Sequence, residues 1–185
     1  TDKLDYFFNF GYLDQGGLWK SGDLNYERYN LRANVGAAIT DRLRSELRIS
    51  GITDRKQQPY AATEEVFKSL WRQSALSPVY ANDNPAYPGN AYDAAHTVVM
   101  TTSDKSGYRN YAGNIFQSSL SLIYDVPGVD GLSARALYSF DYSSNTDKAY
   151  RKEYALYSYD SQTGVYTPNL ANSPSRVRRA FYEKK

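Results

Sequence analysis

The chain has 185 residues, a net charge of +2 at neutral pH, no cysteine and one histidine. The absence of cysteine excludes disulfide scaffolds, thiolate metal sites and cysteine nucleophiles, and the nearly balanced charge predicts no nucleic-acid partner. Nineteen tyrosines help to bring the aromatic share to 15%, which favours β-structure with hydrated surfaces. All apolar runs are far shorter than the roughly 20 residues that a transmembrane helix needs.

Five segments alternate between apolar and other residues with a period of two, as strands with one apolar face do. They lie near residues 6–13, 29–39, 43–52, 111–124 and 132–142. Most approach the length of about 9 to 11 residues that is typical of strands crossing a bilayer at a tilt, and they exceed the usual globular strand. A sixth strand is expected near residues 148–159.

The charges on these segments separate by face. The apolar faces carry none. The opposite faces carry two acids and four arginines: Glu46, Asp141, Arg32, Arg44, Arg48 and Arg135. In a barrel these arginines are expected to face the polar interior, either as a hydrated wall paired with the two acids or in contact with a plug or a passing solute. A soluble β-sandwich separates charge in the same way, because its outer face is wet.

The links between the segments alternate between long and short, as in outer-membrane barrels, whereas a sandwich has no reason to place its long loops at one end. We therefore predict an all-β fold, an antiparallel transmembrane β-barrel section with one long extracellular loop, residues 53–110. This loop carries a short helix, expected over Thr63–Leu76. The rival prediction is a secreted soluble β-sandwich that binds carbohydrate through exposed aromatics.

The long loop supplies the candidate contact residues. Its aromatic side chains either stack on a sugar or peptide or pack within the loop. The candidates are Trp71, Tyr80, Tyr87 and Tyr92. His96 is expected to be an exposed loop residue. Since the sequence contains no catalytic motif and no metal-ligand spacing, we expect no enzymatic activity, no cofactor and no bound metal.

Four stretches, in order, resemble the SusC/RagA-like TonB-dependent transporters of the Bacteroidota outer membrane. The first is a strand with a Gly-rich end, and the second is a strand that leads to a tight turn. The third is a loop helix followed by a proline segment, and the fourth is a strand hairpin. They are residues 6–17 (YFFNFGYLDQGG), residues 26–35 (YERYNLRANV) with 39–43, residues 66–70 with 77–80, and residues 120–125 with 131–134.

This resemblance implies a 22-stranded outer-membrane barrel with an N-terminal plug, energised by TonB from the periplasm. It also implies a SusD-like surface lipoprotein as a partner and the import of oligosaccharides or peptides. The chain would then be one section of a longer transporter, with the plug and the remaining barrel absent, and its partners would include outer-membrane lipid.

Overall fold

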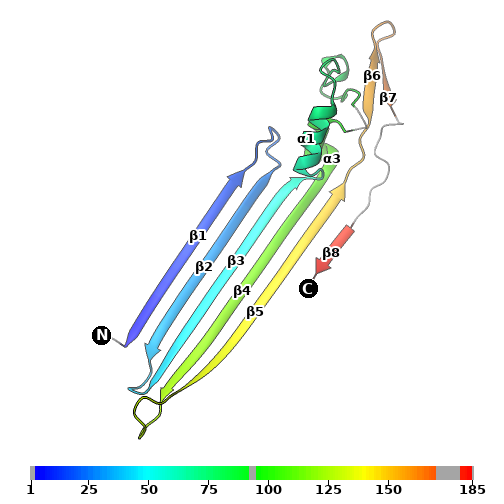
Figure 1. Ribbon diagram of the computed structural model, residues 1–185. Helices are drawn as coiled ribbons and strands as arrows, with labels where there is room; N and C mark the ends of the chain where they lie inside the picture. Colours follow the sequence, from blue (N-terminus) through cyan, green and yellow to red (C-terminus); the bar gives the residue numbers. More distant parts are fainter. Residues whose placement is uncertain (1–2, 92–94, 170–179, 185) are drawn as a thin grey trace.

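A computed structural model describes residues 3–91, 95–169 and 180–184, and its main body is one antiparallel sheet (Figure 1). Six strands lie side by side in the order β1-β2-β3-β4-β5-β8. They are β1 (Leu4–Gly16), β2 (Asn25–Ala38), β3 (Leu43–Pro59), β4 (Gly107–Asp125), β5 (Ser133–Arg151) and β8 (Ala180–Lys184). The first five are consecutive in the chain and each pairs with the next, so the sheet is a meander.

The links between the strands alternate between the two ends of the sheet (Figure 1). Residues 39–42 join β2 to β3, and residues 126–132 join β4 to β5, at one end. Residues 17–24 and the much longer segment 60–106 lie at the other end. The predicted placement of successive links at alternating ends is therefore confirmed, but the first link has eight residues against seven in 126–132, so that only the segment 60–106 is distinctly long.

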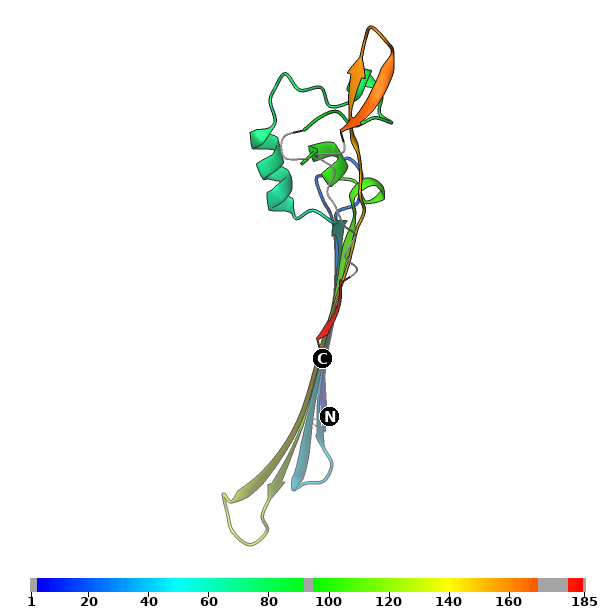
Figure 2. The same cartoon turned by 90° about the vertical axis from the view of Figure 1, so that its right-hand side faces the viewer.

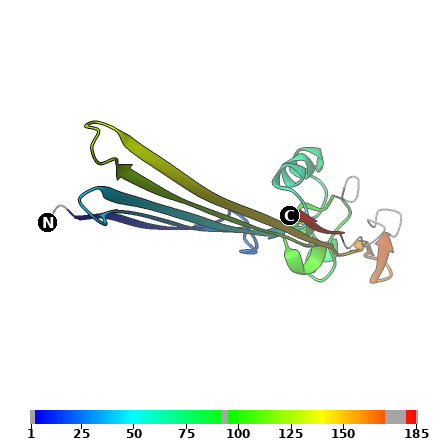
Figure 3. The same ribbon diagram turned by 90° about the horizontal axis from the view of Figure 1, so that it is seen from below.

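The sheet is a single twisted layer, seen edge-on in Figure 2 and from below in Figure 3. One edge is β1. At the other edge, β8 covers only Asn145–Ala149 of β5, and the described residues provide no partner for the rest of that edge. The predicted all-β, antiparallel character is confirmed, and the described sheet is open rather than closed into a barrel.

The region where the sequence predicts a sixth strand, residues 148–159, has a different structure. Its first residues are the end of β5, and its last residues belong to β6 (Leu156–Asp160), which pairs with β7 (Val165–Asn169) in a separate hairpin. Two backbone bonds draw the chain away from the sheet. The N–H of Lys152 donates to Ser106 O over 2.9 Å, and that of Tyr157 donates to Pro88 O over 2.8 Å. After β5, hydrogen bonds to the long link thus replace the strand pairing that would have continued the main sheet.

The long link and the hairpin form what we call the loop cluster, residues 60–91, 95–106 and 156–169. It contains α1 (Thr63–Arg72), the short helix η1 (Ala81–Asp83), α2 (Thr97–Met100) and α3 (Ser103–Ser106). Its buried centre includes Val66, Val99 and Leu156, each at most 1% exposed. The only extensive apolar core among the described residues therefore lies here and not on the sheet.

The helix α1 begins where the sequence predicts but ends four residues early, at Arg72 instead of Leu76. The Ser74 hydroxyl accepts a bond from the N–H of Leu76 over 3.2 Å, which offers the backbone an alternative to the helical bond. No helix among the described residues is long and apolar enough to cross a membrane.

Candidate functional site: two faces of the sheet and a loop cluster

Pairing across five strands brings the predicted apolar faces of the five segments together on one side of the sheet, which we call the apolar face. Residues at the same level form rows, for example Phe8, Ala33, Ile49, Ser118 and Phe140. Three further uncharged rows flank this one. They are Leu4-Ala37-Ser45-Leu122-Ala136, Tyr6-Val35-Leu47-Leu120-Tyr138 and Phe10-Leu31-Gly51-Phe116-Tyr142. In each of the five strands, the alternate residues that the sequence assigns to the apolar face thus lie on the same side of the sheet.

The apolar face is bare in the described part of the chain. Phe8 is 64% exposed and Tyr138 is 69% exposed, and large side chains on every strand from β1 to β5 are exposed in the same way. Monomeric soluble proteins rarely leave so wide an apolar surface in water. The face therefore requires a partner that the described residues do not provide.

The apolar face ends abruptly toward the loop cluster. The fifth row is uncharged, and it begins with Tyr12 and Tyr29, whose ring centroids lie 4.9 Å apart. The next row brings the first charges, Asp14, Glu27 and Arg55. The five uncharged rows span eight residue steps, or roughly 27 Å along a strand, and about 21 Å of height at a tilt of about 40°. With the side chains added, this approaches the apolar band of about 25 Å in outer-membrane barrels.

The four predicted arginines all lie on the opposite, polar face of the sheet. Arg48 Nη2 lies 3.3 Å from Glu46 Oε2, and Arg44 Nη2 lies 3.6 Å from Asp125 Oδ2. Arg135 Nε donates to Ser121 Oγ over 3.0 Å. The expected pairing with Glu46 is present, whereas Asp141 makes no ion pair with any described residue.

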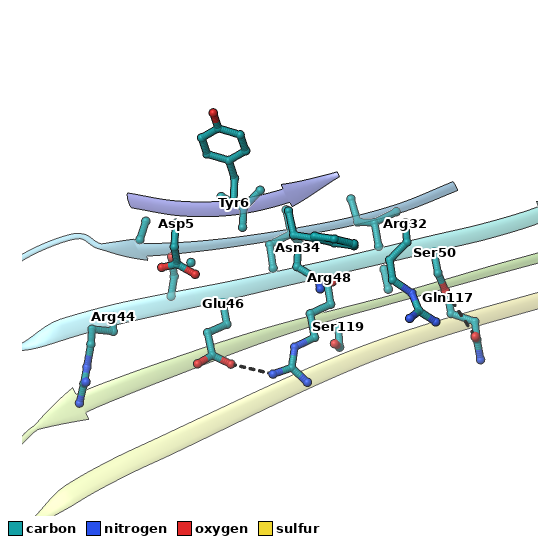
Figure 4. A pocket seen from close by; sticks show the side chains of 18 of the residues that line it. Asp5, Tyr6, Arg32, Asn34, Arg44, Glu46, Arg48, Ser50, Gln117 and Ser119 are labelled. Atoms are coloured by element: carbon teal, nitrogen blue, oxygen red, sulfur yellow. Dashed lines mark hydrogen bonds and ion pairs between the residues drawn. The ribbon is translucent and has the colours of Figure 1, made fainter. Parts of the chain in front are cut away.

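The polar face is hollowed where β1 to β5 curve, with a volume of about 770 Å³ (Figure 4). Side chains of Arg32, Arg44, Glu46 and Arg48 line this hollow, which includes polar residues from β2, β3, β4 and β5. Figure 4 shows these charged side chains pointing to one side of the sheet, whereas Tyr6 points to the other. Of the four predicted arginines, Arg135 alone is outside the lining.

The structure gives the candidate loop aromatics different surroundings. Trp71 is 88% exposed on α1. The ring of Tyr80 lies 5.8 Å from Lys105 Nζ. Tyr87 stacks on Tyr166 of the hairpin, with centroids 4.0 Å apart and planes at 13°. Tyr92 lies outside the described residues. Trp71 is therefore free to contact a solute, whereas Tyr87 packs against other residues of the loop cluster.

The hairpin contributes residues that the sequence reasoning missed. Tyr157 meets the Tyr87 ring edge-on at 5.0 Å, and Tyr159 lies 4.9 Å from Tyr166. Leu156, the first residue of β6, is fully buried. The available signal was the turn between the two hairpin strands, where Asp160 accepts bonds from Gln162 and Thr163.

His96 is 3% exposed, so the expectation of an exposed loop histidine is wrong. Its Nε2 lies 2.7 Å from Val79 O and therefore carries the proton, while Nδ1 accepts from the N–H of Val99 over 3.3 Å. Burial lowers the pKa of His96, and the nearby Lys105 acts in the same direction. A neutral imidazole thus joins residue 79 to α2 and holds the loop cluster together.

The described residues contain no group of three or more His, Cys, Asp or Glu side chains placed to hold a metal ion. No family model matches the sequence, and the search of curated proteins also gave no match. The resemblance to TonB-dependent transporters therefore depends on its four stretches of sequence, and the functional interpretation depends on the two faces of the sheet.

Proposed function

We propose that this chain is a section of an outer-membrane β-barrel, with its apolar face toward lipid and its polar face toward the lumen. The observation that carries the proposal is the set of five uncharged rows, continuous across five strands and bounded by charge at the end toward the loop cluster. In a bilayer such a face needs no second protein layer, because lipid tails cover it.

Two further features support this orientation. Tyr12 and Tyr29 lie at one margin of the rows, and Tyr124 follows Leu122 at the other, where aromatic rings suit the headgroup level. Closure into a barrel would also give the open edges of β1 and β5 their missing partners. The short turns would then face the periplasm and the loop cluster would lie outside.

The activity that we propose is TonB-dependent import of oligosaccharides or peptides, as part of a SusCD-like complex in the outer membrane. Its support is the four-part resemblance, together with a polar hollow on the lumen side and a folded loop cluster at the outer mouth. The plug, the TonB contact and the SusD-like lipoprotein belong to parts of the assembly beyond this chain. The chain itself moves solute and performs no covalent chemistry.

The alternative, a secreted β-sandwich that binds carbohydrate, needs a second sheet packed on the apolar face. The only other sheet among the described residues is the β6-β7 hairpin, which lies within the loop cluster. The alternative also predicts a protein that folds in water without lipid or detergent.

The test places the same substitution on the two faces of the sheet. In the full-length protein folded from urea into lipid vesicles, Ser118→Arg enters the central row of the apolar face, and Ser139→Arg enters the polar face at a neighbouring level. We expect Ser118→Arg to reduce the free energy of folding by about 2 to 4 kcal/mol, and Ser139→Arg to cost less than about 1 kcal/mol. Equal costs, or folding that proceeds without lipid or detergent, would exclude the barrel.

A further inference from the structure

We propose that Arg32 and Arg48 form a binding site for the oxyanion group of a solute, which makes acidic oligosaccharides or acidic peptides the cargo. This inference depends on the proposed function, because it treats the polar face as the wall of a transport lumen. Its basis is an arrangement of charge on β2 and β3 that differs from the rest of the same face.

The two arginines are diagonal neighbours. Arg48 pairs across the strands with Asn34, and Arg32 lies two residues from Asn34 on β2. Diagonal positions on one face of an antiparallel pair lie about 7 to 8 Å apart, which is within reach of long side chains. Both side chains line the hollow and extend from the same side of the sheet (Figure 4). One anionic group between them can therefore contact both guanidinium groups.

The two arginines have one acid between them within salt-bridge distance, and Asp5 and Asp141 line the same hollow further away. Glu46 lies beside Arg48, with Oε2 at 3.3 Å from Nη2, but no described carboxylate lies within 4.0 Å of Arg32. Asp141 occupies the same row as Arg32 but lies three strands away, at roughly 14 Å. By contrast, Arg28 lies directly opposite Asp54. Arg32 therefore has neutral neighbours, Asn9 and Ser50, directly opposite on both adjacent strands, whereas Arg28 faces an acid.

The surrounding residues are neutral and rich in hydrogen-bond donors. Ser50 and Gln117 adjoin Arg32 in its row, and the Ser50 hydroxyl donates to Gln117 Oε1 over 3.4 Å, which directs the amide of Gln117. Asn34 and Ser119 flank Arg48. A carboxylate or sulfate needs several donors, and the planar fork of arginine matches two of its oxygens. These residue types supply the donors that an oxyanion needs, and Phe7, opposite Asn34 on β1, adds one aromatic side chain to the lining.

The level of the pair explains why a solute would meet it. The rows of Arg32 and Arg48 lie on either side of the row of Phe8 and Phe140, which is central among the five uncharged rows of the other face. A solute that crosses the lumen must pass this level. A carboxylate from a polypeptide segment in the lumen has the same chemistry, and the experiment below separates the two sources.

The experiment measures binding to the full-length protein in detergent at low salt by calorimetry. The probes are trigalacturonate and its neutral counterpart galactotriose, and a tripeptide of glutamate and one of glutamine. We expect an acidic probe to bind at least about tenfold more tightly than its neutral counterpart. Arg32→Gln and Arg48→Gln should each remove most of this preference, and the double variant should abolish it. The matched control Arg28→Gln, with the same charge change on the same strand, should preserve it within about twofold.

Equal binding of acidic and neutral probes, or a preference that survives in the double variant, would overturn the proposal. A preference for the acidic sugar alone or the acidic peptide alone would support it and identify the cargo. If Arg32→Gln lowers the melting temperature without solute and the acidic probes do not bind, the oxyanion belongs to the polypeptide and the proposal fails. Alkaline extraction of membranes from the same cells tests the proposed barrel separately: an integral barrel stays in the membrane, whereas release would contradict the proposed function. The binding preference for acidic probes is measured independently of this result, so the two failures can be told apart.

Discussion

The sheet and the loop cluster differ in where their apolar side chains lie: the loop cluster buries them, and the sheet exposes them. The loop cluster buries Val66, Val99 and Leu156 with its own segments, although these residues come from distant parts of the chain. The sheet, which is longer and regular, leaves Phe8 and Phe140 exposed. The cluster can therefore hold its packing by itself in water, whereas the sheet depends on what surrounds it. The difference predicts that the two regions respond to different perturbations.

The largest effect is expected from Leu156→Ala. The side chain of Leu156 is fully buried where the hairpin meets the long link, and its truncation leaves a cavity, so we expect a loss of about 2 to 5 kcal/mol in the stability of the loop cluster. Both tryptophans, Trp19 and Trp71, lie at the loop end, so denaturation followed by tryptophan fluorescence reports this region, while circular dichroism follows the sheet.

The control is Leu76→Ala, because Leu76 is 93% exposed in the same long link. This variant should shift the fluorescence transition by less than about 0.5 kcal/mol. If Leu156→Ala moves the fluorescence and dichroism transitions together, the two regions unfold as one unit and the comparison does not hold.

A smaller effect is expected from acid. Burial lowers the pKa of His96 below its ordinary value of about 6.5, so in acid the unfolded chain binds a proton that the folded loop cluster excludes. Stability is then complete above about pH 6.5 and falls as the pH decreases below it, by at most about 1.4 kcal/mol per pH unit. The fluorescence transition should therefore move to lower denaturant concentration between pH 7.5 and pH 5.

The variant His96→Gln keeps a polar side chain but cannot titrate in this range. It should lower the stability of the loop cluster at pH 7.5 and remove most of the pH dependence. A wild-type transition that is the same at both pH values would show that the imidazole is not held neutral by burial.

The smallest effect concerns the ion pair between Arg109 on β4 and Asp147 on β5. Arg109 Nε donates to both carboxylate oxygens of Asp147, over 3.0 and 3.1 Å, and Nη2 makes a further bond to Oδ2. Since both side chains are partly exposed, a double-mutant cycle with Arg109→Gln and Asp147→Asn should give a coupling of about 0.2 to 1 kcal/mol. The coupling should decrease in high salt, and a value that is insensitive to salt would contradict a solvent-screened pair.

The strands and their faces could be predicted from the sequence because the signal is local. An alternation such as that of residues 29–39 needs only neighbouring residues, and the register across the sheet then aligns the apolar sides. The interior of the loop cluster could not be predicted, because its contacts join segments far apart. His96 bonds to Val79, and Tyr87 stacks on Tyr166, and neither pairing has a periodic signature. The hairpin was missed because only residues 152–155 separate β5 from β6, so that one strand was predicted over 148–159.

The extension of the paired strands beyond the uncharged rows has a mechanical consequence. On β4 and β5 the ladder continues past the first charged row to Gly107 and Arg151, about five further residue steps, or roughly 17 Å of backbone. A flexible tether of this length would let the loop cluster swing freely. A hydrogen-bonded stem instead transmits any push on the cluster to the strands below, so that a load applied at the tip bends the sheet before it displaces the cluster.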